Sequence, residues 1–305
     1  MDFTEEVLAR LASAVSCGYE EGSPCAAEPA ALAALALLAH RRDAAALRLL
    51  DWLIDQQNSS GCLGTESDPS ISAWATGWAV IAWKTALHGS IANDRFSPAI
   101  GRALGWVLKL QGTIMNRNDW QGHDPTLVGW PWVEGTHSWV EPTIINLLAL
   151  RHTGYGDHAR AREARLLLAD RLLPEGGCNY GNTAVLGQML RPHLQPTGLC
   201  LTALAGAIET TPRIANSIEY LVRELSARTA TASLCYGLIG LAAQKRFPAQ
   251  AEHWLKAAAG RTLARERSGY KLALLALASL GEDCPLIARH DSPLPVAPTL
   301  EGSTP

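Results

Sequence analysis

Two kinds of apolar segment alternate along this chain, and their alternation restricts its fold more than any other feature. Segments of the first kind are apolar on nearly every side, which is typical of helices in a protein interior; they are 28–39, 69–87, 141–150, 196–207, 232–243 and 269–280. Segments of the second kind carry one apolar stripe at helical spacing; they are 3–15, 44–56, 100–108, 158–172, 213–228 and 249–258. The pattern predicts twelve helices in six pairs, each of one outer and one inner helix.

The pairs form an internal repeat. The inner segments begin near residues 28, 68, 141, 195, 231 and 268, which fits a unit of roughly 36–40 residues with two insertions. Six hairpins with uniformly apolar inner helices predict an all-α fold, a single α/α toroid over 1–284, in preference to an open solenoid. The proline-rich tail, 285–305, is expected to be disordered or draped over one end of the ring, and we assign it no function.

Composition indicates the cellular setting and argues against some partners. The formal net charge is −3 and the basic residues are scattered, which argues against a nucleic-acid face. Seven cysteines at irregular spacing form no zinc or disulfide pattern, so we expect free thiols in a reducing cytoplasm, with no metal and no cofactor. The acidic N-terminus does not resemble a signal peptide, and no charge-free apolar run of about 18 residues indicates a membrane span. Peripheral contact with a membrane stays open.

Loop lengths predict where a functional site lies. Connections from an inner helix to the next outer helix are short, whereas the first four connections from outer to inner are long: 16–27, 57–68, 112–138 and 173–195. In a ring of hairpins these long loops share one rim with the N-termini of the inner helices, where the positive ends of the helix dipoles converge. The longest loop is also rich in tryptophan and ionisable residues and leads into a buried helix, which favours a functional role.

Three segments carry a recurrent pattern of an aromatic residue and glycine, with glutamine in the first two: LDWLIDQQNSSGCLG at 50–64, LGWVLKLQG at 104–112 and PEGGCNYGN at 174–182. This pattern resembles the QW-type repeat of squalene-hopene cyclases. SWVEPT at 138–143 is similar to repeat segments of the wider terpenoid cyclase and protein prenyltransferase superfamily of α/α toroids. The resemblance covers most of 30–280 and implies a terpene cyclase-like protein. Such a protein would act on an isoprenoid or other apolar small molecule, by acid-initiated cyclisation in a tryptophan-lined lumen.

Motifs that this superfamily uses for chemistry are missing. The chain has no DxDD acid motif, no Asp-x-Cys with the distant His of the prenyltransferase zinc site, and no DDxxD motif for magnesium diphosphate. Whether the chain is an enzyme therefore stays open. The alternative to a cyclase is a non-catalytic toroid that binds a hydrophobic ligand or a protein and has lost the catalytic motifs.

The long loop offers the acid that a cyclase of this kind requires. Asp124 or Asp119 could protonate the substrate, and His123 or His137 could tune that acid by hydrogen bonding or charge. A structural interpretation competes with this one. His123, Asp124 and Pro125 also fit a turn in which the aspartate caps the backbone.

A second candidate acid, Glu141, stands at the start of an inner helix. It recurs in register as Glu28 and Asp68, with Gln195 in the fourth repeat. Such carboxyl groups can form a cluster with shifted pKa values, or they can simply favour the helix dipole. Their repetition argues for the structural role. Glu141 nevertheless remains a candidate catalytic residue, because the aromatic loop leads directly into it. A third hypothesis, a carbohydrate-active toroid, needs two facing carboxyl groups, which Glu141 with Asp68 or Glu28 could supply.

Aromatic side chains are the candidates for substrate contact. Their ring faces suit isoprenoid chains and cations, and they also suit sugar rings. Large aromatic residues at helical spacing are equally typical of plain core packing. The candidates are Trp74, Trp78, Trp130, Trp132, Trp139 and Tyr180.

Overall fold

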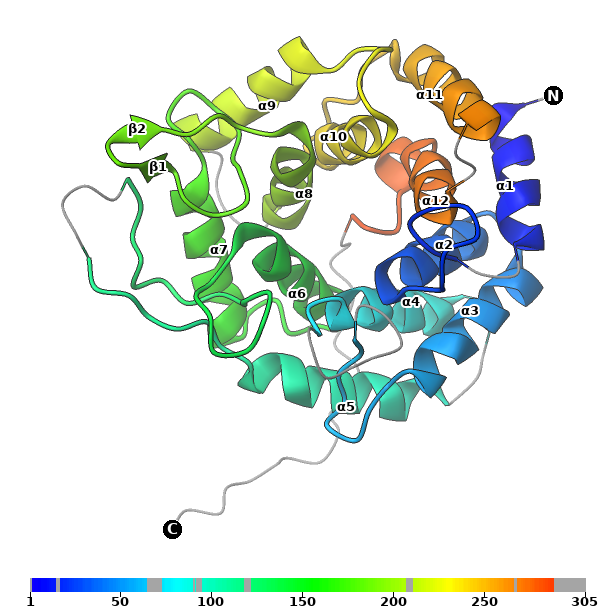
Figure 1. The fold of residues 1–305 in the computed structure, drawn as a ribbon, viewed down its shortest axis with the longest axis horizontal. Coiled ribbons are helices and arrows are strands. Elements are labelled where there is room, and N and C mark those ends of the chain that lie inside the picture. Colours follow the sequence, from blue (N-terminus) through cyan, green and yellow to red (C-terminus); the bar gives the residue numbers. More distant parts are fainter. Residues whose placement is uncertain are drawn as a thin grey trace.

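The computed structural model describes residues 2–14, 17–64, 73–89, 91, 95–117, 122–206, 211–265 and 268–287. Over these residues, twelve α-helices form two concentric rings (Figure 1). The inner ring contains α2 (Ala27–Ala39), α4 (Thr76–His88), α6 (Val140–His152), α8 (Leu194–Leu204), α10 (Thr231–Ala243) and α12 (Gly269–Ala278). The outer ring contains α1 (Phe3–Ser13), α3 (Asp43–Asp55), α5 (Phe96–Lys109), α7 (Ala159–Arg171), α9 (Pro212–Glu224) and α11 (Ala251–Arg265). The predicted all-α toroid of six helical hairpins is confirmed.

The inner ring is closed. Each inner helix packs against the next, and α12 packs against α2. Between α8 and α10 the backbones touch, because a Cβ atom at Gly198 would lie 2.2 Å from the carbonyl oxygen of Tyr236. Glycine is therefore required at this crossing. None of the helices in the described part of the chain is long and apolar enough to cross a membrane.

The two predicted kinds of helix differ in burial as expected. In α6 every residue from Val140 to Leu150 is buried, because the helix has neighbours on all sides. In α9 burial is confined to one stripe, Ile214, Ser217, Ile218 and Leu221. Apolar periodicity thus separates the inner from the outer ring.

Threonine side chains fix three long loops onto the starts of inner helices. The hydroxyl oxygens of Thr76, Thr143 and Thr197 each accept a hydrogen bond of 3.0 Å from a loop backbone N–H, that of Leu63, Trp130 and Cys178 respectively. The repeated contact sets the register of the repeats. In this register Trp74, two residues before Thr76, takes the place of Glu141, whereas Asp68 was the predicted equivalent. Asp68 lies outside the described residues, and α4 begins at Thr76 instead of the expected residue 69.

The recurrent glutamine and glycine residues connect neighbouring outer helices. The side-chain amide of Gln57 donates to the carbonyl oxygens of Gly61 and Ala99, each at 2.9 Å, and so ties the end of α3 to α5. Gly61 has φ 96°, and a Cβ atom there would lie 2.3 Å from the backbone oxygen of Arg102. Gly176 approaches the backbone oxygen of Asn216 on α9 equally closely, at 2.3 Å. The packing of neighbouring hairpins therefore explains why these residues recur.

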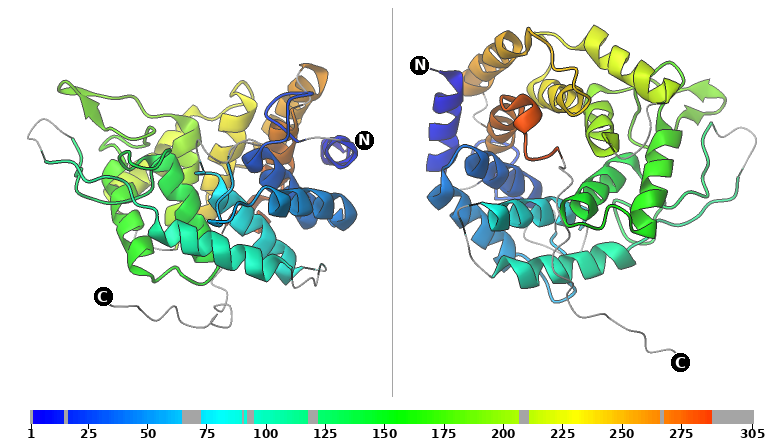
Figure 2. Two further views of the ribbon diagram at one scale, coloured as in Figure 1. Left: turned by 60° about the horizontal axis from the view of Figure 1, so that its bottom comes forward. Right: turned by 180° about the vertical axis from the view of Figure 1, so that it is seen from behind.

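One feature of the long loops was not predicted. Strands β1 (Ala184–Val185) and β2 (Gln188–Met189) form a short antiparallel hairpin between α7 and α8. Its two turn residues, Leu186 and Gly187, have φ values of 50° and 73°, as a tight primed turn requires. Figure 2 shows this hairpin projecting away from the ring.

The chain after α12 turns into the ring on the far face (Figure 2, right). It passes through a short 3-10 helix, Gly281–Asp283, and Leu286 is then fully buried. The ring nitrogen Nε2 of His152 lies 3.4 Å from the carbonyl oxygen of Leu286. The first residues of the predicted tail are thus docked against the toroid, and residues 288–305 lie outside the described part of the chain.

Candidate active site

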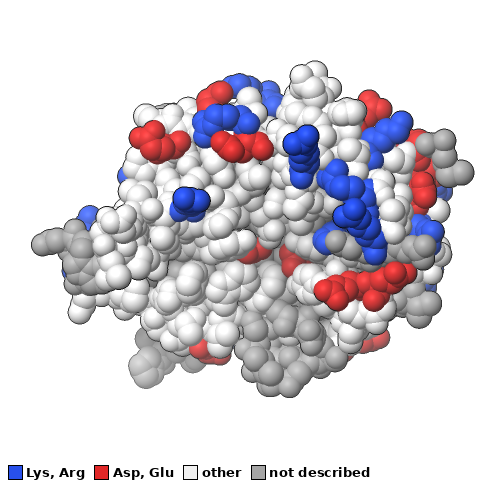
Figure 3. Space-filling view, turned by 45° about the horizontal axis from the view of Figure 1, so that its top comes forward, with Lys and Arg blue, Asp and Glu red and all other residues white. Residues whose placement is uncertain are grey.

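Two buried carboxyl groups lie within electrostatic reach of each other. Glu28 and Glu141 are each the second residue of an inner helix, in α2 and α6, and they are only 4% and 6% exposed. The negative charge of Glu28 raises the pKa of Glu141. Acidic atoms are visible in the middle of the face in Figure 3, surrounded mostly by uncharged surface. The centre of the rim is therefore acidic and otherwise nearly free of charge.

Tyrosine hydroxyl groups hold the Glu28 carboxyl group. Tyr19 donates to its Oε2 at 2.7 Å and Tyr236 to its Oε1 at 3.2 Å. Tyr270 in turn donates to the hydroxyl of Tyr236 at 3.4 Å. Burial raises the pKa of Glu28 to about 7, although the tyrosine hydrogen bonds favour the carboxylate and oppose the rise. This carboxyl group is fixed in place and titrates near neutrality.

The Glu141 carboxyl group has fewer partners. Its Oε1 accepts one long hydrogen bond, 3.4 Å, from the side-chain amide of Gln195 on α8. Burial raises the pKa of Glu141 to about 8, and the nearby charge of Glu28 adds to the shift. The positive end of the α6 dipole acts in the opposite direction and does not compensate. Glu141 is consequently protonated at neutral pH.

The indole of Trp78 adds a polar group beside this pair. It is fully buried and lies close enough to Glu28 to favour the carboxylate. Its Nε1–H, however, makes no hydrogen bond of normal geometry to any described residue. Buried donors are nearly always paired in proteins. Trp78 thus adds a buried polar group beside Glu28 that favours its carboxylate form.

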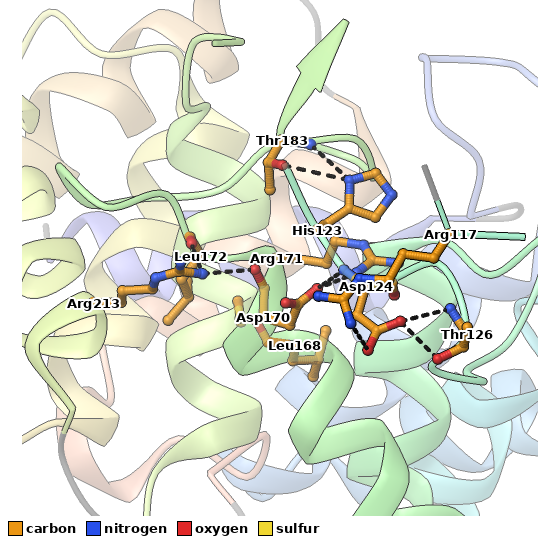
Figure 4. A network of polar contacts seen from close by, with 11 residues as sticks. Arg117, His123, Asp124, Thr126, Leu168, Asp170, Arg171, Leu172, Thr183 and Arg213 are labelled. Carbon is orange, nitrogen blue, oxygen red and sulfur yellow. Dashed lines mark hydrogen bonds and ion pairs between the residues drawn. The ribbon is translucent and has the colours of Figure 1, made fainter. Parts of the chain in front are cut away.

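Asp124 and His123 belong to a separate network (Figure 4). The Asp124 carboxylate accepts from the backbone N–H and the hydroxyl of Thr126, at 2.9 and 2.6 Å, and these bonds lower its pKa. The geometry is that of an aspartate capping a turn. A lowered pKa is the reverse of what a proton-donating acid needs. Asp119 lies outside the described residues.

Both predicted histidines lie beside this network. The Nδ1 atom of His123 faces the backbone N–H and hydroxyl of Thr183, and burial lowers the pKa of His123 to about 4. His137 stacks on Trp139 with ring centroids 4.5 Å apart, and burial lowers its pKa as well. The two histidines line one small cavity of about 10 Å³. The lining of this cavity includes neither Glu28 nor Glu141, so the structure separates the predicted catalytic residues into two groups.

The predicted tryptophans do not form one aromatic chamber. Trp130 is fully buried in the wall between the rings, where its N–H donates to the Val107 carbonyl oxygen at 2.8 Å. The Arg160 guanidinium lies 4.1 Å from the centre of its ring. Trp74 and Trp132 pair edge to face at 4.8 Å and are partly exposed. The main role of these three side chains is therefore packing.

Trp139 and Tyr180 lie on the loops around α6. The Trp139 ring supports the glycine turn of the loop between α7 and α8, because a Cβ atom at Gly181 would lie 2.6 Å from it. Tyr180 is 39% exposed, and its ring packs beside that of His193 at 5.4 Å. The charge of Glu141 contributes to raising the pKa of Tyr180. Of the predicted aromatic residues, Tyr180 and Trp78 are thus the ones with an electrostatic link to the carboxyl pair.

Sequence reasoning did not find the tyrosines that surround Glu28. Tyr236 follows it by 208 residues, and Tyr270 belongs to the last inner helix. The available signal was weak, a tyrosine inside an otherwise aliphatic inner helix, as in LCYGLIG at 234–240. These hydroxyl groups reach Glu28, in the first repeat, only because the ring of helices closes.

Comparisons with solved structures show which known proteins share this fold. No protein-family model and no curated protein sequence matches this chain. Among solved structures, it is similar to a reducing-end-xylose releasing exo-oligoxylanase mutant complexed with xylobiose, with a TM-score of 0.60, 11% identity and coverage of 94% of each chain. A glycosidase variant in complex with glucose gives 0.61, 12% identity and coverage of 93% and 96%. An inactive α-1,6-mannanase variant of Salegentibacter sp. with α-1,6-mannotriose gives 0.59, 12% identity and coverage of 93% and 98%.

These findings correct the resemblance to terpenoid cyclases. The assignment to the terpenoid cyclase and prenyltransferase superfamily is wrong, and so are the cyclase activity and the apolar ligand that it implied. The three structures named above, which share the fold over nearly the whole chain, are glycosidases with bound sugars. The non-catalytic hydrophobic-ligand toroid has no support either. The physical reason is that the recurrent sequence pattern reflects hairpin packing, while the rim presents carboxyl and phenol groups.

Proposed function

We propose that this protein is a glycoside hydrolase whose two catalytic carboxyl groups are Glu28 and Glu141. The observation that carries the proposal is the pair itself, two buried carboxyl groups with raised pKa values at equivalent positions of inner helices α2 and α6. Hydrolysis of a glycosidic bond requires two such groups in different protonation states. The similarity to solved glycosidase structures supports the proposal, because those enzymes share the fold of this chain.

The contacts suggest a division of roles. Glu141, with the higher pKa and one long hydrogen bond, serves as the general acid and donates its proton to the glycosidic oxygen as the C–O bond breaks. Glu28, held by Tyr19 and Tyr236, serves as the carboxylate. It either takes a proton from the attacking water or attacks the anomeric carbon itself. Water supplies the hydroxyl group of the new reducing end. The other proton of that water returns to the carboxyl pair and restores its starting protonation state.

The coupling between the groups fits this division. Two carboxyl groups in one low-dielectric site resist losing both protons, so the pair retains one proton through neutral pH. A polar ligand with many hydroxyl groups matches such a site better than a hydrocarbon chain does.

Sugar release from defined oligosaccharides tests the proposal. Purified protein is incubated with xylo-, gluco- and α-1,6-manno-oligosaccharides, and products are separated by chromatography. We expect hydrolysis of one of these series and a loss of about 10²–10⁴-fold in Glu141→Gln and in Glu28→Gln. Glu134→Gln, an exposed change in the same loop region, is the matched control and should keep activity. Equal activity in all three variants would remove the carboxyl pair from the mechanism.

A further inference from the structure

A pocket of about 280 Å³ lies beside the carboxyl pair on the rim. Its lining comes from the loop before α8 and from the starts or faces of three helices; it consists of Tyr180, Pro192, His193, Leu194, Gln195, Tyr220 and Ser233. Of these lining side chains, Gln195 is the one with a hydrogen bond to the carboxyl pair. The pocket therefore needs its own explanation.

Gln195 connects the pocket to the site. Its side chain lines the pocket, and its amide nitrogen also donates to Glu141 Oε1 at 3.4 Å. A backbone hydrogen bond also holds Tyr180 next to the start of α6, because the carbonyl oxygen of Tyr180 accepts from the N–H of Val140 at 2.9 Å. Val140 directly precedes Glu141. A ligand in the pocket would thus lie next to a molecule held at the carboxyl groups.

The lining combines an aromatic surface with polar groups. The Tyr180 ring is 39% exposed and braced by His193, with ring centroids 5.4 Å apart and planes at 39°. Tyr220 is held by its hydroxyl, which donates to the Pro192 carbonyl oxygen at 3.2 Å. The second anchor of the segment is the 2.8 Å bond from the His193 N–H to the Cys178 carbonyl oxygen. Braced aromatic rings with an amide nearby suit a ring that is apolar on its face and polar at its edge.

We propose that this pocket is a saccharide subsite, in which one sugar unit packs on Tyr180 while its neighbour lies at Glu28 and Glu141. The inference rests on the proposed function and adds a substrate class to it. The substrate is an oligosaccharide that extends from the carboxyl pair toward α8, and a glycoside of one sugar leaves the pocket empty. Tyr180 is then a determinant of chain-length preference.

Binding to an inactive form tests the subsite directly. Glu141→Gln is titrated with xylotriose, α-1,6-mannotriose and cellotriose and with the corresponding monosaccharides, by isothermal calorimetry. Adding Tyr180→Ala should weaken binding of the recognised trisaccharide about tenfold and leave monosaccharide binding unchanged. Tyr180→Phe, which keeps the ring, should restore most of the affinity. In the active protein, Tyr180→Ala should raise KM for the trisaccharide with little change in kcat.

Tyr155→Ala is the matched control. Tyr155 is also 39% exposed and also packs beside a histidine, His158, but it follows the C-terminal end of α6. If Tyr180→Ala binds the trisaccharide as tightly as Tyr155→Ala does, the subsite is refuted while the proposed function stands. If the parent protein neither binds nor cleaves any saccharide in the series, the proposed function and the subsite are both refuted. Circular dichroism spectra equal to the parent's confirm that each variant is folded.

Discussion

Glu28 and Glu141 occupy the same second position of inner helices α2 and α6, and the charge of Glu28 raises the pKa of Glu141. The N-terminal end of a helix normally lowers the pKa of a carboxyl group. Here burial prevails, with pKa values of about 7 and 8. Burial thus turns two acids in the first turn of their helices into groups that exchange protons near neutrality.

The pH dependence of hydrolysis should follow this pair. Activity requires one proton shared between the two groups, so kcat/KM should be bell-shaped with its maximum near pH 7–8. Tyr19→Phe removes a donor to the Glu28 carboxylate, and the acid limb should therefore move to higher pH. Initial rates between pH 4 and 10 measure both effects. An unshifted acid limb in Tyr19→Phe would show that Glu28 does not set it.

Stability should fall as pH rises. The folded-state pKa of Glu141 is raised from 4.5 to about 8, so its contribution to the free energy of unfolding is complete below pH 4.5 and is lost as pH rises through about 8. For a buried group the loss is on the order of a few kcal/mol. Urea unfolding of the parent at pH 5 and pH 9 should show the decline, and Glu141→Gln should reduce it. A decline equally steep in Glu141→Gln would contradict the raised pKa.

Asp124→Asn should leave hydrolysis within about twofold of the parent. The Asp124 carboxylate is occupied by Thr126, and its pKa is lowered. Removing a general acid would instead cost about 10²–10⁴-fold. Reducing-sugar release at the pH optimum measures the difference. A loss of that larger size would restore Asp124 as a catalytic candidate.

Gly61→Ala should destabilise the toroid far more than Gly22→Ala. Both glycines have positive φ, 96° and 76°, which costs an alanine about 1–2 kcal/mol. At Gly61 the new Cβ atom would also lie 2.3 Å from the Arg102 backbone oxygen, whereas at Gly22 nothing lies within 4 Å. We expect about 3 kcal/mol or more at Gly61. Thermal and urea unfolding of the two variants provide the comparison, and equal losses would mean that the hairpin contact carries no stability.

The architecture was readable from the sequence because it depends on local periodicity. Whether a helix is apolar all round, as in 141–150, or on one stripe, as in 213–228, is a property of its own residues, and it separates the two rings. Loop lengths likewise indicated the rim on which Glu28 and Glu141 lie. Loop structure was less accessible, since the β-hairpin at 184–189 depends on two residues with positive φ.

The chemistry depends on which residues meet, and only the closed ring decides that. Glu28 and Tyr236 are 208 residues apart, yet they share a hydrogen bond because α12 and α10 complete the circle beside α2. Burial raises the pKa of Glu141, whereas hydrogen bonds lower the pKa of Asp124. The sequence by itself determined the helices, their pairing and the rim on which Glu28 and Glu141 lie. Tertiary structure selected the carboxyl pair, because pKa values follow from desolvation and neighbours that no local pattern encodes.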